Sequence, residues 1–335
     1  MADTSSVSQT VTSLSAQDIR AVANWPLVID ALREGHRLPT ADINDLLVGS
    51  NTDDKAVMLV RGAWINGLAS GVKAATVVPA NPQRTPPLPS VHAQIVLFDP
   101  TTGQVTGLVD GTEVTAWKTA GDSALGSDLL SRPDSETLLM VGAGAMAAPL
   151  IAAHHTVRPN LKRVLVWNRS APRGDALVES LSSVYENIAR VEDLETAVRD
   201  ADIVCSATMT DDPILKGAWL RPGTHVDLVG AFTPAMREAD DETHAVARWF
   251  VDSRKSTLHH IGELKIPLEA GVITQEAIQG DLYELVAGEA GRQSPQDITV
   301  FKNGGGAHLD IMVSAALVAW HNIKAAQHNS DRADG

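Results

Sequence analysis

The sequence is short of cysteine and of positive charge. Cysteine occurs once among 335 residues, so the chain cannot form an internal disulfide. That residue, Cys205, lies in the apolar run 203–205, and we predict that it is buried in a strand. Lys and Arg number 27 against 41 Asp and Glu, which gives a net charge of −14. Because an acidic chain is repelled by polyanions, we expect neither nucleic acid nor an anionic membrane surface as a partner.

A basic leader and a long apolar run are also missing. The first 17 residues are rich in Ser and Thr, and no run approaches the roughly 20 apolar residues that span a bilayer. We therefore expect a cytoplasmic protein with no membrane partner. Hydrophobic residues make up 44% of the chain and charged residues 20%, which is typical of a folded globular protein. A few local Lys and Arg residues could still bind a small anion, so the net charge leaves the ligand open.

The spacing of apolar residues changes near residue 136. Before that point it predicts helices over 22–33 and 112–130, strands over 56–60 and 71–78, and a hairpin formed by 93–98 and 105–109. After it, short apolar runs alternate with helical stretches, which is typical of a parallel sheet with crossover helices. A final helix over 311–326 could pack back on the first part. We expect an α/β fold of two domains, residues 1–118 joined by 311–335, and residues 119–310.

A glycine-rich turn follows the predicted strand 136–141. Its sequence, from Gly142 through Gly144 to Ala147, fits the G-x-G-x-x-G/A fingerprint of a Rossmann dinucleotide-binding domain. The first glycine permits the tight turn, the second lets the backbone approach a pyrophosphate, and the next helix directs its N-terminal amides at phosphate oxygens. We therefore assign Gly142, Gly144, Ala145 and Met146 to cofactor binding. Alternatively, the turn serves packing alone.

The residues after the next predicted strand, 163–167, bear on the choice of cofactor. NAD-specific sites commonly have Asp or Glu there, which binds the ribose 2′-hydroxyl and repels a 2′-phosphate. This chain has Asn168, Arg169 and Ser170 instead. Because a guanidinium suits a phosphate, we predict NADP(H) as the preferred cofactor and NAD(H) as the second choice. Alternatively, Arg169 is a solvated loop residue.

Several segments together resemble the ornithine cyclodeaminase and mu-crystallin superfamily, over nearly the whole chain. The matching segments are 71–73, 110–120, the Gly142 turn, 202–209, 217–225, 230–241 and 301–302. The pair 217–225 and 230–241 is the most specific and resembles the bacterial Δ1-pyrroline-2-carboxylate reductases. The resemblance implies a Rossmann domain and a second α/β domain for substrate binding and dimerisation, built from the N-terminal segment and the C-terminal helix. A homodimer is expected on this ground.

The resemblance also implies an activity, the NAD(P)H-dependent reduction of a small cyclic imino acid. The substrates it suggests are Δ1-pyrroline-2-carboxylate, which gives proline, and the six-membered Δ1-piperideine-2-carboxylate, which gives pipecolate. Phe232 stands where the cyclodeaminases have a catalytic Asp. Since Phe can neither take nor give a proton, ornithine ring closure is disfavoured. The alternatives are a cyclodeaminase, an amino-acid dehydrogenase, or a mu-crystallin-like protein that binds NADP and a small ligand without turnover.

The substrate residues follow from the same resemblance. Lys73 matches a family lysine at the substrate and could bind the carboxylate or donate a proton. Asp310 matches a family acidic residue near the pocket, where it would keep a buried Lys73 charged. Lys118 replaces the Arg of most members, and Arg61 could compensate as a second carboxylate clamp. Without the resemblance, Lys73 reads as an exposed lysine at a strand end, and Asp310 as a helix N-terminal residue.

The nicotinamide half of the cofactor is assigned by the same comparison. Thr208 and Met209 match positions that line it, and Thr119 and Phe232 are assigned to cofactor binding as well. The loop 303–306, Asn-Gly-Gly-Gly, departs from the family pattern, and its extra glycines are predicted to loosen it. The adjacent histidine pairs, 154–155 and 259–260, lack the spacing of a metal site, and no metal is expected.

Overall fold

The chain has a mixed α/β architecture. A computed structural model describes residues 11–49 and 55–333. Contacts divide the chain into a first unit, residues 1–118 with 306–335, and a second unit, residues 119–305. This division groups residues 306–310 with the first unit, whereas the sequence boundary had grouped them with the second.

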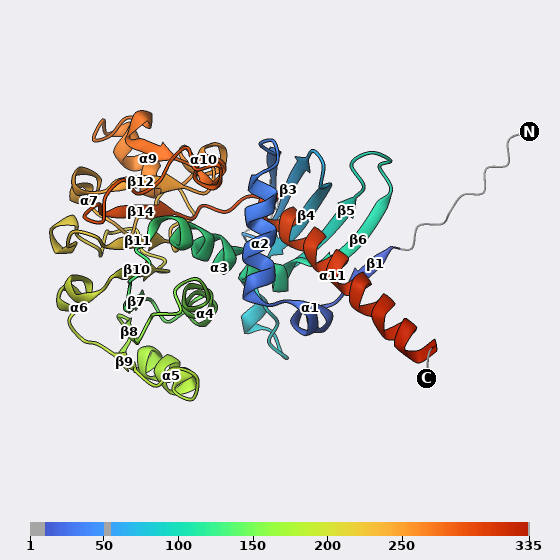
Figure 1. Ribbon diagram of the computed structural model, residues 1–335, viewed down its shortest axis with the longest axis horizontal. Coiled ribbons are helices and arrows are strands. Elements are labelled where there is room, and N and C mark those ends of the chain that lie inside the picture. Colours follow the sequence, from blue (N-terminus) through green and yellow to red (C-terminus); the bar gives the residue numbers. More distant parts are fainter. Residues whose placement is uncertain (1–10, 50–54, 334–335) are drawn as a thin grey trace, which may run out of the picture. The chain divides into compact units, whose positions relative to one another are not determined.

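The first unit is built on a six-stranded sheet with the order β1-β6-β5-β4-β3-β2. β1 pairs in parallel with β6, and the other neighbours pair antiparallel. The strands are β1 (Thr12–Leu14), β2 (Asp42–Gly49), β3 (Val57–Ile65), β4 (Ala69–Val77), β5 (Val91–Phe98) and β6 (Val105–Asp110). The helices are α1 (Ala16–Val22), α2 (Trp25–His36) and α11 (Ala307–Ala333), and α11 contacts both the sheet and α2 (Figure 1). Gly71 of β4 lies so close to Ile311 that a side chain there would collide with α11.

The predicted hairpin is confirmed in β5 and β6. The Asp99 carboxylate accepts hydrogen bonds from the backbone N–H of Thr101 (2.9 Å) and Thr102 (2.7 Å). Gly103 has a φ of +73°, the left-handed region that glycine adopts without strain. These two features reverse the chain between the strands.

The second unit contains an eight-stranded, all-parallel sheet with the order β13-β12-β14-β11-β10-β7-β8-β9. Its strands are β7 (Thr137–Val141), β8 (Arg163–Trp167), β9 (Ile188–Arg190), β10 (Ile203–Ser206), β11 (His225–Leu228), β12 (Arg248–Val251), β13 (Ile278–Gly280) and β14 (Thr299–Lys302). Its helices are the later part of α3 (Gly111–Leu130), α4 (Ala147–Val157), α5 (Ala171–Leu181), α6 (Leu194–Asp200), α7 (Asp241–Val246), α8 (Arg254–Thr257), α9 (Gly262–Glu269) and α10 (Leu282–Ala287). β7, β10 and β11 are buried at every position, as parallel strands covered on both faces should be. The predicted parallel sheet is confirmed.

The structure corrects several predicted boundaries. The helix predicted over 22–33 is α2, which begins at Trp25 because Asn24 caps it through its side chain and Pro26 fits only a first helical turn, and Val22 ends the separate helix α1. The edge strand β2 was not predicted, since most of its residues are exposed and its apolar residues do not alternate. The last helix begins at Ala307 rather than 311. Its first turn contains buried polar residues such as His308, which do not contribute to the apolar spacing from which the helix was predicted.

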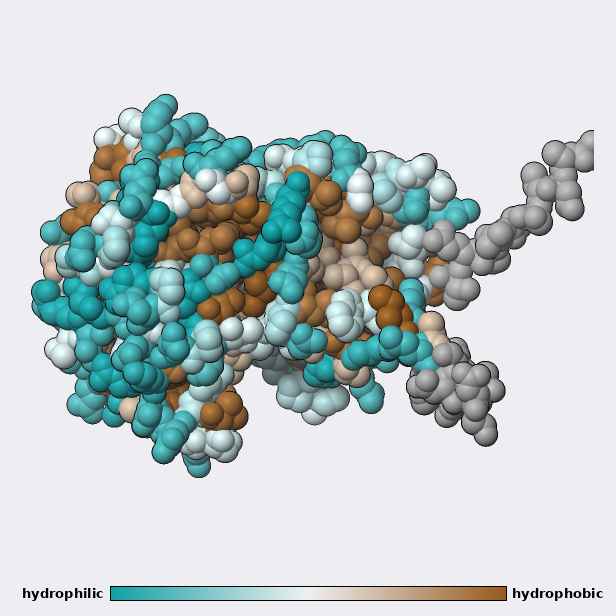
Figure 2. All heavy atoms as spheres, in the orientation of Figure 1, coloured by the Kyte–Doolittle hydropathy of each residue, from teal (hydrophilic) through white to brown (hydrophobic). Residues whose placement is uncertain are grey.

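The outer side of α6 in the second unit is polar. Figure 2 shows hydrophilic side chains over α6, whose exposed positions include Glu195, Arg199 and Asp200. Among the described helices, none combines the length and the apolar composition needed to cross a bilayer.

Candidate functional site

The glycine turn after β7 has the geometry that a phosphate-binding turn requires. Gly142 has a φ of +109°, and a Cβ there would lie 2.7 Å from the Ala207 carbonyl oxygen, so only glycine fits. α4 follows with Met146 at its N-cap, and no side chain caps its first N–H groups. The helix therefore offers uncapped amides and the positive end of its dipole to an anion.

A crevice of about 240 Å³ lies at this turn. It follows the carboxyl ends of β7, β8 and β10, where the strand order of the sheet reverses, which is where open α/β sheets bind dinucleotides. Its lining consists of Gly142, Ala143, Gly144, Trp167, Asn168, Arg169, Ser170, Arg173, Ala207, Thr208, Met209, Thr210 and Ile214. A larger hollow beside Glu136 and Lys162 lies at the amino ends of β7 and β8, the wrong edge for a dinucleotide.

Some of the predicted cofactor residues line the crevice and others do not. Gly142, Gly144, Asn168, Arg169, Ser170, Thr208 and Met209 line it together. Thr119, Ala145, Met146 and Phe232 do not line it. The Phe232 side chain is 60% exposed, and the Thr119 carbonyl accepts a hydrogen bond from Asn303 Nδ2 at 2.9 Å.

Arg173 was missed from the sequence. It lies in the first turn of α5, one turn after Arg169, and a cation is unusual there because the helix dipole favours acids. This unfavourable position of a cation is the feature of the sequence that could have identified Arg173 as a site residue. Among the described residues, neither Arg169 nor Arg173 has a side-chain partner, whereas every other arginine between 119 and 305 bonds a carboxylate or a carbonyl. Those contacts include Arg190 with Asp175 (2.7 Å), Arg199 with Glu195 (2.8 Å) and Arg254 with Glu284 (3.0 Å).

The loop that carries Arg169 and leads into α5 is fixed by Asn168. Its Oδ1 accepts the backbone N–H of Ala143 at 3.0 Å, and its Nδ2 donates to the Ser170 carbonyl at 2.8 Å. The side chain thereby joins the glycine turn to the loop after β8. No carboxylate is present among the crevice residues. The two arginines thus give this end of the crevice an uncompensated positive charge.

A second polar cluster lies in the first unit, around Lys73 of β4. Its Nζ lies 2.9 Å from Asp310 Oδ1 and donates to Thr115 Oγ1 at 2.6 Å. Both members of the pair are buried, so Lys73 is not the solvent-exposed lysine of the alternative interpretation. Burial alone would raise the pKa of Asp310, but the charges of Lys118 and Lys73 and the bond from Lys73 hold it below its usual value. Asp310 is therefore ionised at neutral pH.

Lys118 and Arg61 add positive charge to this cluster. Lys118 is buried and acts on Asp310 electrostatically. The guanidinium of Arg61 on β3 contacts Asp45 Oδ2 on β2 through Nε (2.9 Å) and Nη2 (2.8 Å). Part of its hydrogen-bonding capacity is therefore already used within the protein. Burial, and then the charges of His36 and Lys118, keep the pKa of His308 well below its usual value, which makes this histidine neutral. We call Lys73, Lys118 and Arg61 the cation cluster.

The glycine loop after β14 is held firmly, contrary to the prediction that it is loose. The Asp252 carboxylate accepts the backbone N–H of Gly304 (2.9 Å) and of Gly305. A Cβ at Gly304 would collide with Thr257, so glycine is required for packing there. Asn303 Nδ2 anchors the start of the loop on the Thr119 carbonyl and on Ser123 Oγ.

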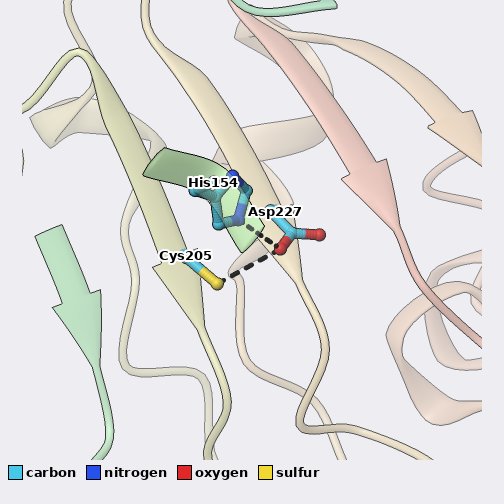
Figure 3. A group of neighbouring side chains, drawn as sticks. All are labelled: His154, Cys205 and Asp227. Atoms are coloured by element: carbon cyan, nitrogen blue, oxygen red, sulfur yellow. Dashed lines mark hydrogen bonds and ion pairs between the residues drawn. The ribbon is translucent and has the colours of Figure 1, made fainter. Parts of the chain in front are cut away.

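The core beneath α4 contains a buried polar cluster (Figure 3). Asp227 Oδ2 accepts from Cys205 Sγ at 3.1 Å and lies 3.2 Å from His154 Nε2, and Oδ1 accepts from Ser123 Oγ at 3.0 Å. Burial, followed by the charge of Asp227, raises the pKa of the Cys205 thiol well above its ordinary value. The thiol therefore stays protonated, and the cluster joins α3, α4, β10 and β11 as part of the core. The predicted burial of Cys205 in a strand is confirmed.

A family model covers most of the chain. The model of the ornithine cyclodeaminase/mu-crystallin family matches residues 29–326. The chain belongs to this family. A curated relative, Δ1-pyrroline-2-carboxylate reductase of Paracoccus denitrificans, is 49% identical over 91% of this chain and 95% of its own length.

Two solved members of the family have the same fold. Δ1-pyrroline-2-carboxylate reductase of Thermococcus litoralis, in complex with NADH and L-proline, matches with a TM-score of 0.84 and 29% identity over 95% of this chain and 98% of its own. Iminosuccinate reductase of Paracoccus denitrificans, in complex with NAD+, matches with a TM-score of 0.84 and 26% identity over 94% and 97%. The crevice described above thus belongs to a fold that holds nicotinamide dinucleotides in these relatives.

A pair of buried glutamates in the second unit has unusual titration behaviour. Glu263 of α9 accepts the backbone N–H of Glu238 (2.7 Å) and of Ala239 (3.0 Å). Burial, and then the neighbouring Glu238, raise the pKa of Glu263 to about 7, while the charge of Lys302 opposes the shift. Burial also raises the pKa of Glu238.

We expect Glu263→Gln to flatten the dependence of stability on pH. An acid with a raised pKa binds more protons in the folded state, so its contribution to stability is lost as the pH rises from about 4.5 to about 7. A shift of this size corresponds to about 3 kcal/mol. Thermal unfolding between pH 5 and pH 8 should show the melting temperature of the wild type falling more steeply than that of the variant. Parallel curves would contradict the assignment, and the exposed Glu242→Gln serves as control.

Proposed function

We propose that the protein reduces the C=N bond of a small cyclic imino acid with a nicotinamide dinucleotide. The foremost substrate is Δ1-pyrroline-2-carboxylate, which gives proline, and the second is Δ1-piperideine-2-carboxylate, which gives pipecolate. The observation that carries the proposal is the 49% identity, over 91% of the chain, with a relative named for this reaction. The crevice of the second unit and the cation cluster of the first supply the two kinds of binding that the reaction needs.

The cation cluster suits the carboxylate of an imino acid. Lys73, Lys118 and Arg61 all act electrostatically on Asp310, so the cluster brings three cationic side chains to one place. A buried ammonium held by one carboxylate can bind a second anion through its remaining donor capacity. We assign Lys73 and Lys118 to the substrate carboxylate and Arg61 to a supporting position beside Asp45.

Reduction of an imine requires a hydride at carbon and a proton at nitrogen. The bound dinucleotide supplies the hydride. Lys73 can supply the proton, directly or through water, because Asp310 at 2.9 Å holds its ammonium in place as a donor. Asp310 acts as the partner that orients Lys73. Hydride addition and proton transfer together convert the C=N bond to CH–NH without a further reactant.

We propose NADP(H) as the preferred cofactor. Arg169 and Arg173 line the crevice at the loop after β8, where the adenine ribose of a dinucleotide is bound in this type of fold, and no carboxylate lies among the lining residues. Guanidinium groups without protein partners suit a 2′-phosphate. We therefore assign cofactor binding to the second unit and substrate binding and dimerisation to the first.

We propose further that the protein forms a homodimer through the first unit. β2 is an edge strand, and Leu46, Leu47 and Val48 on it are 60%, 64% and 44% exposed. An exposed apolar edge strand is an interface or an aggregation hazard, and a second copy of the chain would cover it. The double variant Leu46→Lys/Leu47→Lys should raise the Kd of self-association at least about 100-fold, since each leucine buried in the interface contributes about 2 kcal/mol.

Sedimentation of the wild type and the double variant tests this assembly. The wild type is expected at twice 35.5 kDa and the variant at 35.5 kDa. Val184→Lys, at a position that is 68% exposed in the second unit, is the control and should leave the wild-type mass unchanged. A monomeric wild type, or a dimer that survives both lysines, would refute the interface.

Other functions of the family are less well supported. A cyclodeaminase needs a proton-transferring group at the position of Phe232, where this chain has an aromatic ring that is 60% exposed. An amino-acid dehydrogenase would release ammonia when it oxidises its product. A mu-crystallin-like binding protein would bind NADP(H) without turnover.

The decisive assay follows NADPH oxidation with five- and six-membered cyclic imino acids. We expect turnover with both rings, and no ammonia release from ornithine or alanine in the presence of NADP+. Cofactor binding without oxidation across the whole panel would favour the non-catalytic alternative. Ammonia release would favour the cyclodeaminase or the dehydrogenase.

A further inference from the structure

Glu238 is a fully buried carboxylate that receives five hydrogen bonds. Its Oε1 accepts from Ser206 Oγ (2.6 Å), Thr208 N (2.8 Å) and Thr208 Oγ1 (2.8 Å). Its Oε2 accepts from the backbone N–H of Gly230 (2.6 Å) and Ala231 (3.2 Å). One side chain therefore joins the segment after β10 to the segment after β11.

These two segments are also in direct backbone contact. A Cβ at Gly230 would overlap the backbone of Thr208, so glycine is required at this position. β10 and β11 are adjacent parallel strands, and the segment after β10 contributes Thr208 and Met209 to the crevice. The position of Thr208 in the crevice thus depends on Glu238 and Gly230 together.

The arrangement requires a carboxylate at position 238. All five partners are donors, and a glutamine would offer one acceptor oxygen and an NH2 group that faces other donors. Lys302 is the buried counter-charge, and its Nζ donates to the carbonyls of Leu228 (2.9 Å) and Asn303 (2.7 Å). The main chain of Glu238 is fixed in turn by Glu263, which accepts its N–H.

We infer that Glu238 is a positioning residue for the nicotinamide half of the bound dinucleotide, because it holds Thr208 and Gly230 in the conformation that shapes this end of the crevice. The inference rests on the proposed function. Glu238 does not line the crevice, and we assign the adenine half to the other lining segments, the glycine turn and the loop with Arg169. Removal of the carboxylate therefore affects one half of the ligand and spares the other.

Binding of two ligands to Glu238→Gln tests the inference. NADPH contains both halves, whereas adenosine 2′,5′-bisphosphate contains the 2′-phosphate and adenine without nicotinamide. By calorimetry, the Kd of NADPH should rise about 10-fold in the variant, and that of the bisphosphate should stay within about 2-fold, because one charged acceptor is lost at the nicotinamide end only. The kcat of imine reduction should fall together with NADPH affinity, and Glu238→Asp should recover part of both losses.

Two further variants keep the test decisive. Ser206→Ala removes one donor to Oε1 without altering a residue that lines the crevice, and it should give the same pattern at about 3-fold. Glu242→Gln, at an exposed position of α7, should change neither Kd. Equal weakening of both ligands, or unchanged NADPH binding in Glu238→Gln and Ser206→Ala, would overturn the inference. If the wild type binds neither ligand, the proposed function fails instead.

Discussion

Replacement of Lys73 by methionine is expected to lower kcat/KM for a cyclic imino acid about 1,000-fold. The variant loses the charge that binds the carboxylate and the group assigned to protonate the imine nitrogen, and proton transfer alone is worth about 100- to 10,000-fold. Methionine preserves much of the side-chain volume at this buried position of β4. The measurement is steady-state NADPH oxidation with the five- and six-membered substrates.

A control is needed for the effect of the unpaired Asp310 carboxylate on stability. Lys73→Met leaves Asp310 buried without its ion-pair partner, which destabilises a fold by about 3–5 kcal/mol. The double variant Lys73→Met/Asp310→Asn removes both charges and should fold more stably while remaining as inactive. Both variants should bind NADPH with the wild-type Kd, because the cofactor is assigned to the other unit. Lys324→Ala, at an exposed position of α11, should retain full activity. Full turnover by Lys73→Met would refute the assigned role.

Charge reversal at Arg169 and Arg173 is expected to reverse the cofactor preference. In the variant Arg169→Glu/Arg173→Glu, two guanidinium groups that suit a 2′-phosphate become carboxylates that repel it and can bind the ribose 2′-hydroxyl. We expect kcat/KM for NADPH to fall about 100- to 1,000-fold, since each charged hydrogen bond is worth about 1.5–3 kcal/mol, and kcat/KM for NADH to change by less than about 5-fold.

A control variant can distinguish the specific effect of Arg169 and Arg173 on cofactor preference from a general effect of changed surface charge. Arg199→Glu places the same reversal on α6, at a residue that pairs with Glu195 and does not line the crevice, and it should leave both cofactors unaffected. Single variants should show whether Arg173, at the start of α5, contributes as much as Arg169. An equal loss with NADPH and NADH would contradict a role at the 2′-phosphate.

The second unit was the easier part of the fold to predict from the sequence. The strands β7 and β10 are mostly apolar runs because both faces of the parallel sheet are covered, and such runs are visible without a structure. The glycine turn was predictable too. Its positive φ and the close approach of Ala207 allow only glycine at position 142, so the requirement is visible as a glycine in the sequence pattern. Each of these features shows as a pattern of residues that are close together in the sequence, so the sequence pattern was sufficient to predict it.

The parts that depend on distant contacts were not predictable. Glu238 and Glu263 are acidic residues in a sequence rich in acids, and only their burial distinguishes them. The Asp45–Arg61 pair joins two strands whose pairing was not predicted, because β2 was not recognised. The glycines of 303–306 suggest a flexible loop in sequence, yet Asp252 and Thr257 fix them from elsewhere in the chain.

The single thiol gives the protein a built-in reporter of opening. Cys205 is enclosed in the core of the second unit and stays protonated because burial, and then the neighbouring Asp227, raise its pKa, so a maleimide or an aromatic disulfide reagent should label the chain only when that core is transiently exposed. The labelling rate would then measure how often the core opens, with or without a bound dinucleotide, and no engineered residue would be needed. Any cysteine introduced at the surface could be modified first and selectively.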